Sequence, residues 1–136
     1  MLDDHLWTSL EGVIIELARQ IVAPTGVEID INYDAGVPAV ANDGALVGVQ
    51  TRAVLAAFGP QAVSDTPQSM GGEDFAWYLQ TVPGALARLG VRAPGAVQSC
   101  DLHQSNFDID EDALAIGVRF TASVLDELWA DAASTQ

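Results

Sequence analysis

The chain has 136 residues, of which 49% are apolar and 18% are charged, and its formal net charge is −14. This length and composition are typical of a single domain, and such a domain is large enough to bury a hydrophobic core. The acidic balance argues against nucleic acid as a partner, because phosphate binding needs clustered Lys and Arg. Here there is no Lys, and the five Arg are scattered along the sequence.

Cysteine usage and hydropathy exclude further classes of protein. Cys100 is the one cysteine, so neither an internal disulfide nor a cysteine-rich zinc site is possible. Every apolar run is far shorter than the ~20 residues of a membrane-spanning helix. The first ten residues lack the basic and apolar blocks of a signal peptide, and we therefore expect a cytoplasmic protein with no membrane partner.

Hydrophobic periodicity predicts the first elements. A helix is expected over residues 7–22, because its apolar residues recur at helical spacing: Leu6, Leu10, Val13, Ile14, Leu17 and Ile21. Pro24 and Gly26 end it. The following stretch, "VEIDINY" (27–33), alternates apolar and polar residues strictly, which predicts a half-buried strand with one solvated face.

The rest of the sequence continues the alternation of helix and strand. After a Gly/Pro-containing connection we expect a helix that starts at Asn42 or Asp43 and runs to about Phe58. A brief strand within 61–70, a short helix after the paired glycines and a buried strand at 85–91 come next. Asp108 or Asp110 then caps a last helix with one apolar stripe. This order predicts an α/β fold.

The first helix and strand form a unit too small to be stable alone. A strand with one polar face needs a neighbouring strand, and the sequence offers none nearby. We therefore expect residues 1–34 to be the end of an incomplete domain and residues 35–136 to belong to a second one. The open strand edge is expected to pair with another chain or to rearrange.

The stretch "MGGEDF" contains the first candidate site. Gly71 and Gly72 permit close approach of the backbone, and the amides at the helix start that follows can face an anion. Glu73 and Asp74 would also favour the helix dipole. The alternative is an ordinary glycine turn followed by acidic residues. A phosphate loop is excluded because no Lys follows.

The stretch "DLHQSNFDID" contains the second candidate, His103. An imidazole is a common transition-metal ligand, and Asp101 could fix its tautomer. A catalytic zinc needs about three protein ligands, however, and the other histidine, His5, lies far away in the sequence. From spacing alone, a metal ligand, a catalytic base and a structural residue before a helix all remain open.

Three motifs in this order resemble a known family. They are "SMGGEDFAWYL" (69–79), "VPGALARLGVR" (82–92) and "LHQSNFDIDEDALAIGVR" (102–119). They look like the C-terminal part of the metal-dependent amidohydrolases that include hippurate hydrolase, aminoacylase-like enzymes and indole-acetyl-amino-acid hydrolases. The resemblance extends over residues 2–128.

The resemblance implies a zinc-peptidase-like enzyme with a catalytic α/β domain and an inserted α+β lid, or dimerisation-type, domain. Residues 1–34 would be the last helix and strand of the lid, and residues 35–136 the C-terminal part of the catalytic domain, both incomplete. It implies hydrolysis of N-acyl-amino-acid amides by water on two divalent metal ions, zinc or manganese, with a carboxylate as general base. His103 matches the family's last metal ligand. Gly71, Gly72 and Glu73 match a segment that lines the substrate cleft.

Most of the family's active site has no counterpart in this sequence. The other ligands and the general base belong to a Cys/His motif and a Glu-Glu pair in the N-terminal half of the family, so we assign no catalytic residue here. We expect a C-terminal fragment or truncated relative that is inactive alone, with an unoccupied metal site. It would form homo-oligomers or pair with a complementary chain. The alternative is a non-catalytic interaction module that associates through its open strand edge.

Overall fold

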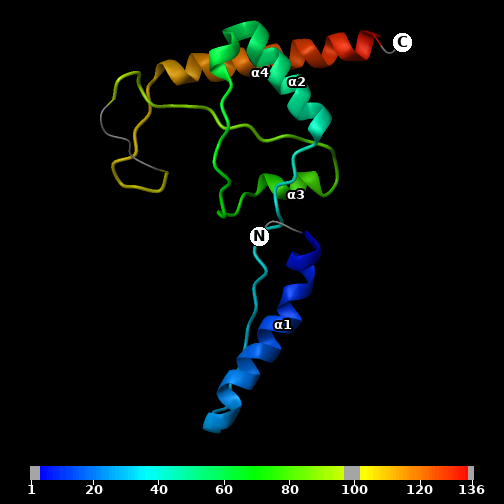
Figure 1. Ribbon diagram of the computed structural model, residues 1–136, viewed down its shortest axis with the longest axis vertical. Helices are drawn as coiled ribbons and strands as arrows, with labels where there is room; N and C mark the ends of the chain where they lie inside the picture. The colour runs from blue at the N-terminus through cyan, green and yellow to red at the C-terminus, as the bar shows by residue number, and fades with distance from the viewer. Residues whose placement is uncertain (1–3, 97–101, 135–136) are drawn as a thin grey trace. The chain divides into compact units, whose positions relative to one another are not determined.

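The structure is a computed structural model that describes residues 4–96 and 102–134 (Figure 1). Over these two ranges every regular element is helical. The α-helices are α1 (Asp4–Val22), α2 (Gly44–Phe58), α3 (Phe75–Leu79) and α4 (Asp112–Ser134), and two short 3₁₀ helices are η1 (Ala23–Thr25) and η2 (Pro60–Ala62). None of the described helices is both long and apolar enough to cross a membrane.

The expected α/β fold is wrong for the described residues, which contain no strand. Residues 27–33 have the alternating sequence of a strand and run as extended chain, but they form no ladder. The stretches 61–70 and 85–91 likewise form no strand. The physical reason is that a strand exists only through hydrogen bonds to a neighbouring segment, and period-two alternation does not supply the neighbour. The described residues therefore lack the open strand edge through which an interaction module was expected to associate.

The chain divides into two compact units. The first comprises residues 1–43 and 67–86, and the second comprises residues 44–66 and 87–136. This division differs from the expected boundary at residue 34. That boundary was expected between the two domains of a complete amidohydrolase, and it stays a prediction. Each unit is built from two stretches of sequence, so long-range contacts between those stretches stabilise each one.

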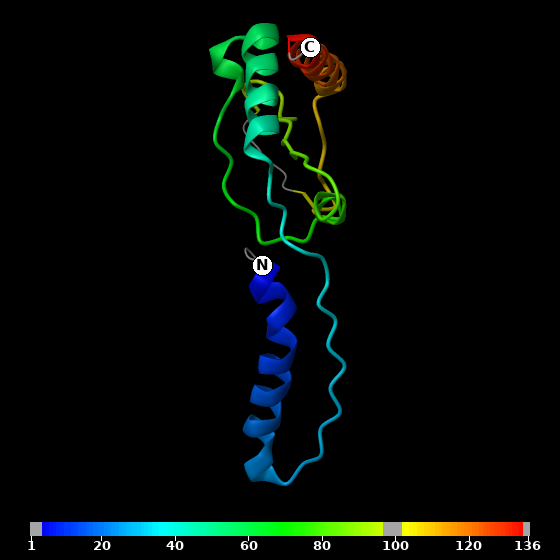
Figure 2. The same ribbon diagram turned by 90° about the vertical axis from the view of Figure 1, so that its right-hand side faces the viewer.

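In the first unit, α1 and the chain that follows it lie side by side (Figures 1 and 2). Helix α1 matches the predicted helix, and Gly26 with φ 70° ends η1 directly behind it. Trp7 ties the start of α1 to the returning chain, since its indole Nε1 donates a hydrogen bond to the carbonyl of Ala35 at 2.8 Å. The same indole meets Trp77 of α3 edge-on, with ring centroids 5.6 Å apart.

In the second unit, α2 and α4 pack against each other (Figure 2). Helix α2 confirms the predicted helix, and its Val49 and Ala53 are buried. Arg52 forms ion pairs across the helix pair, with Glu127 at 3.2 Å and Asp131 at 2.6 Å. At the start of α4 the carboxylate of Asp110 accepts a hydrogen bond from the amide of Asp112 at 3.1 Å, which agrees with the predicted cap.

Candidate functional site

The segment Gly71-Gly72-Glu73 lies directly before α3 in the first unit. A carboxylate oxygen of Glu73, Oε1, accepts a hydrogen bond from the amide of Phe75 at 3.3 Å, and the carbonyl of Glu73 accepts one from Ala76 at 3.0 Å. Glu73 therefore closes the turn that starts α3. All three candidate residues are exposed, so a ligand would have access to them within this unit.

The paired glycines have a packing reason that the sequence did not reveal. A Cβ on Gly72 would lie 2.8 Å from Cγ2 of Val37, so the backbone at Gly72 approaches the segment before α2 more closely than any side chain permits. A Cβ on Gly71 would lie 3.3 Å from Oγ of Ser69, a milder contact. Close approach between residues 37 and 72 is thus a structural requirement whether or not substrate binds there.

His103 lies in a turn of the second unit that precedes α4. Its side chain is exposed. Its backbone has φ 69°, which makes it the one described non-glycine residue with positive φ. His, Asn and Asp enter this left-handed region more readily than other residues, and such positions cluster where a side chain must be aimed. Cys100 and Asp101, the residue expected to orient His103, lie outside the described residues.

The described residues do not by themselves complete a metal site. Across residues 4–96 and 102–134 there is no group of three or more His, Cys, Asp or Glu side chains that could hold a metal ion. His103 has the chemistry of a ligand, but one imidazole cannot replace the three or more protein ligands of a catalytic zinc. The metal ions implied by the resemblance therefore do not fit on these residues alone.

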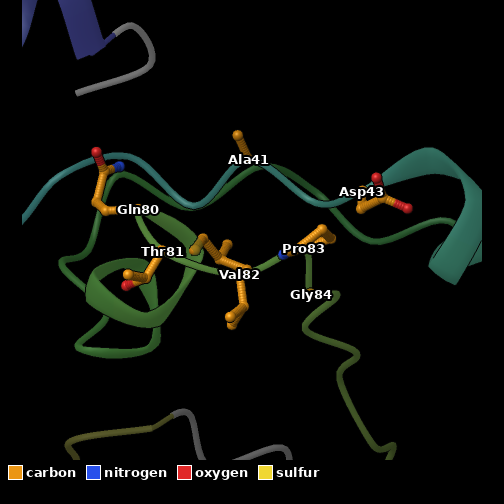
Figure 3. A pocket seen from close by; sticks show the side chains of 8 residues that line it. Ala41, Asp43, Gln80, Thr81, Val82, Pro83 and Gly84 are labelled. Atoms are coloured by element: carbon orange, nitrogen blue, oxygen red, sulfur yellow. The ribbon is translucent and has the colours of Figure 1, made fainter.

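A hollow of about 330 Å³ opens in the first unit, away from every predicted site residue (Figure 3). Two segments line it: Ala41 and Asp43 before α2, and residues 79–84 after α3. Asp43 is the single charged residue among them. Gly71, Gly72, Glu73 and His103 do not contribute to the lining, and the hollow contains no pair of groups suited to acid–base or nucleophilic chemistry.

Asn42 holds together the two segments that line this hollow. Its side-chain nitrogen Nδ2 donates to the carbonyl of Leu86 at 3.0 Å, and its oxygen Oδ1 accepts from the amide of Leu86 at 2.9 Å. The amide of Asp43 also donates to the carbonyl of Gly84 at 2.8 Å. The sequence suggested Asn42 as a helix cap and gave no signal of this contact, because the partner lies 44 residues further on.

Comparison with known proteins identifies the class. Residues 4–127 match the model of Peptidase family M20/M25/M40. Since this match covers most of the 136 residues, the chain belongs to that family, and the resemblance to metal-dependent amidohydrolases is confirmed. No solved structure gives a significant match.

Three relatives illustrate the range of the family. A protein of Rhodococcus jostii named as a glutamate–cysteine ligase is 42% identical over 83% of this chain and 14% of the relative. The N-acetyl-L-cysteine deacetylase of Bacillus subtilis is 33% identical over 82% of this chain and 25% of the relative. An IAA-amino acid hydrolase of Arabidopsis thaliana is 29% identical over 85% of this chain and 26% of the relative.

The chain spans only 14% to 32% of the length of the curated relatives that it matches. The family is metal-dependent, and the greater part of each of these relatives lies outside the matched stretch. An active site shared between the matched stretch and the remainder would explain why the described residues contain one candidate ligand and no catalytic pair.

Proposed function

We propose that this chain supplies the C-terminal part of a metal-dependent amidohydrolase that cleaves N-acyl-amino-acid amide bonds. The observation that carries the proposal is the family match over residues 4–127 together with the small share of each relative that the chain covers. The contribution of this part is one metal ligand, His103, and a segment of the substrate cleft at Gly71, Gly72 and Glu73. The remaining ligands and the general base belong to the rest of the enzyme.

His103 suits this role in two respects. Its imidazole is exposed, and its left-handed backbone aims the side chain from a turn rather than from a helix face. As a neutral ligand it would hold a metal through one ring nitrogen, and the metal would supply an activated water for attack on the amide carbonyl. Glu73 contributes polarity at the cleft, whereas the amide of Gly71 already donates a hydrogen bond to Oγ of Ser69 at 3.1 Å.

A chimeric enzyme tests the proposal. The matched 112 residues of the Bacillus subtilis deacetylase are replaced by those of this chain, and hydrolysis of N-acetylcysteine and bound metal are measured. We expect a metal-containing, active chimera in which His103→Ala lowers activity by roughly 100-fold or more and reduces metal content. His5→Ala is the matched control, since His5 is the other histidine in the chain. Equal activity in the two variants would refute the assignment of His103.

A further inference from the structure

Trp7 connects three segments of the first unit. Its indole Nε1 donates a hydrogen bond to the carbonyl of Ala35 at 2.8 Å, and its ring meets Trp77 of α3 edge-on, with centroids 5.6 Å apart. Residues 8–34, which we call the arm, comprise the rest of α1, η1 and the extended chain that returns from them. Trp7 and Ala35 flank the arm at its two ends, so Trp7 links these ends to each other and to α3.

A second contact connects the end of the arm to the candidate cleft segment, residues 71–73. Val37 follows the arm closely in the sequence, and its Cγ2 would lie 2.8 Å from a Cβ on Gly72. Glu73 is the next residue, and its carbonyl accepts a hydrogen bond from the amide of Ala76 at 3.0 Å, at the start of α3. The end of the arm, the cleft segment and α3 are therefore joined in a closed ring by the two indoles.

The buried residues of the first unit adjoin the same contacts. Among the residues that the structure describes in this unit, only Pro38 and Ala76 are buried. Pro38 directly follows Val37, and Ala76 directly precedes Trp77. Little core is therefore available to hold α3 in place. An edge-on aromatic pair and an indole hydrogen bond both restrict orientation, so the two contacts of Trp7 have a large share in the position of α3.

We propose that Trp7 is a positioning residue for substrate binding, because it fixes the candidate cleft segment relative to the arm. This inference rests on the proposed function, in which Gly71, Gly72 and Glu73 belong to the substrate cleft. Trp7 acts through α3 and through the returning end of the arm rather than on the substrate. A displaced α3 moves the Glu73 carboxylate with it, and even a small displacement of a binding group weakens its contact with the substrate.

Hydrogen–deuterium exchange on the full chain tests the coupling without any measurement of activity. We expect Trp7→Leu to raise the exchange rate of the Ala76 amide roughly fivefold or more, while the amides of α2 and α4 keep their rates. Trp7→Phe keeps an aromatic ring against Trp77 and should recover most of the protection. Trp129→Leu is the matched control, since Trp129 is a 70% exposed tryptophan of the second unit, and it should leave Ala76 unchanged. Equal exchange at Ala76 in the two leucine variants would overturn the proposal, and so would a uniform rise over all helices.

The kinetics of the chimera with the Bacillus subtilis deacetylase separate positioning from metal chemistry. The exchanged stretch is extended to residues 4–127, so that it includes Trp7. We expect Trp7→Leu to raise KM for N-acetylcysteine roughly tenfold and to leave kcat and metal content within about twofold, since the cleft segment binds substrate and His103 holds metal. A lower kcat or metal content with unchanged KM would contradict the positioning role. Failure of the proposed function would instead leave the chimera without metal or turnover before any substitution, and the exchange result on the full chain would stand.

Discussion

At the scale of single residues, the candidate cleft segment is shaped by packing. Gly72 leaves no room for a side chain because Cγ2 of Val37 would stand 2.8 Å from an added Cβ. We expect Gly72→Ala to lower the free energy of unfolding of the isolated chain by about 1–2 kcal/mol, as overpacking commonly does. Chemical denaturation without any substrate or metal measures this effect.

Gly12→Ala is the contrasting control for that experiment. Gly12 lies inside α1 with no atom within 4 Å of an added Cβ, so alanine should stabilise the helix by about 0.5–1 kcal/mol. If Gly72→Ala proved as harmless as Gly12→Ala, then the close approach to Val37 would not constrain the fold. The role of Gly72 would then have to be sought in substrate binding alone.

At the scale of elements, a side chain of α4 binds a backbone carbonyl at the C-terminal end of α2. Helix α2 has no basic residue in its last turn, but Arg119 of α4 donates a hydrogen bond to the carbonyl of Ala57 at 2.5 Å. The same guanidinium lies 4.7 Å from the ring centroid of Phe58. A cation at this place satisfies a terminal carbonyl and the helix dipole, and it joins the two helices.

Arg119→Met should therefore lower the free energy of unfolding by about 1 kcal/mol, because it removes the hydrogen bond and the cation–π contact but keeps most of the apolar stem. Arg92→Met, at an exposed loop position, is the matched control and should stay within about 0.5 kcal/mol of the unchanged chain. Thermal unfolding followed at 222 nm compares the two. Equal effects would show that Arg119 does not secure the helix pair.

The helices were predictable because their signals are local. The apolar spacing of residues 6–21 and the Gly59-Pro60 stop determine α1 and α2 within a few residues. Strands were not predictable in the same way, since "VEIDINY" specifies which faces alternate and says nothing about a neighbour to pair with. The same distinction applies to the candidate site. The motif around His103 could be recognised from the sequence, whereas the positive φ of His103 and the contact of Asn42 with Leu86 depend on tertiary context.

At the scale of the whole molecule, the chain exposes more surface than its mass predicts. Its accessible surface is 10556 Å², whereas two separate compact bodies of half its mass would expose about 8,200 Å² together. Among the described residues the buried apolar side chains are few and small: Val49, Ala53, Ala76 and Ala113. Little hydrophobic burial is therefore available to offset the conformational entropy lost on folding.

This balance predicts that the isolated chain has a low stability that depends on salt. At low ionic strength we expect a monomer with a free energy of unfolding below about 5 kcal/mol, since a net charge of −14 keeps copies apart. Raising sodium chloride screens that repulsion, so self-association through exposed apolar faces and the unfolding midpoint should rise together. Size-exclusion chromatography with light scattering and thermal unfolding at two salt concentrations measure both. A stable monomer unaffected by salt would mean that the exposed apolar faces need no partner.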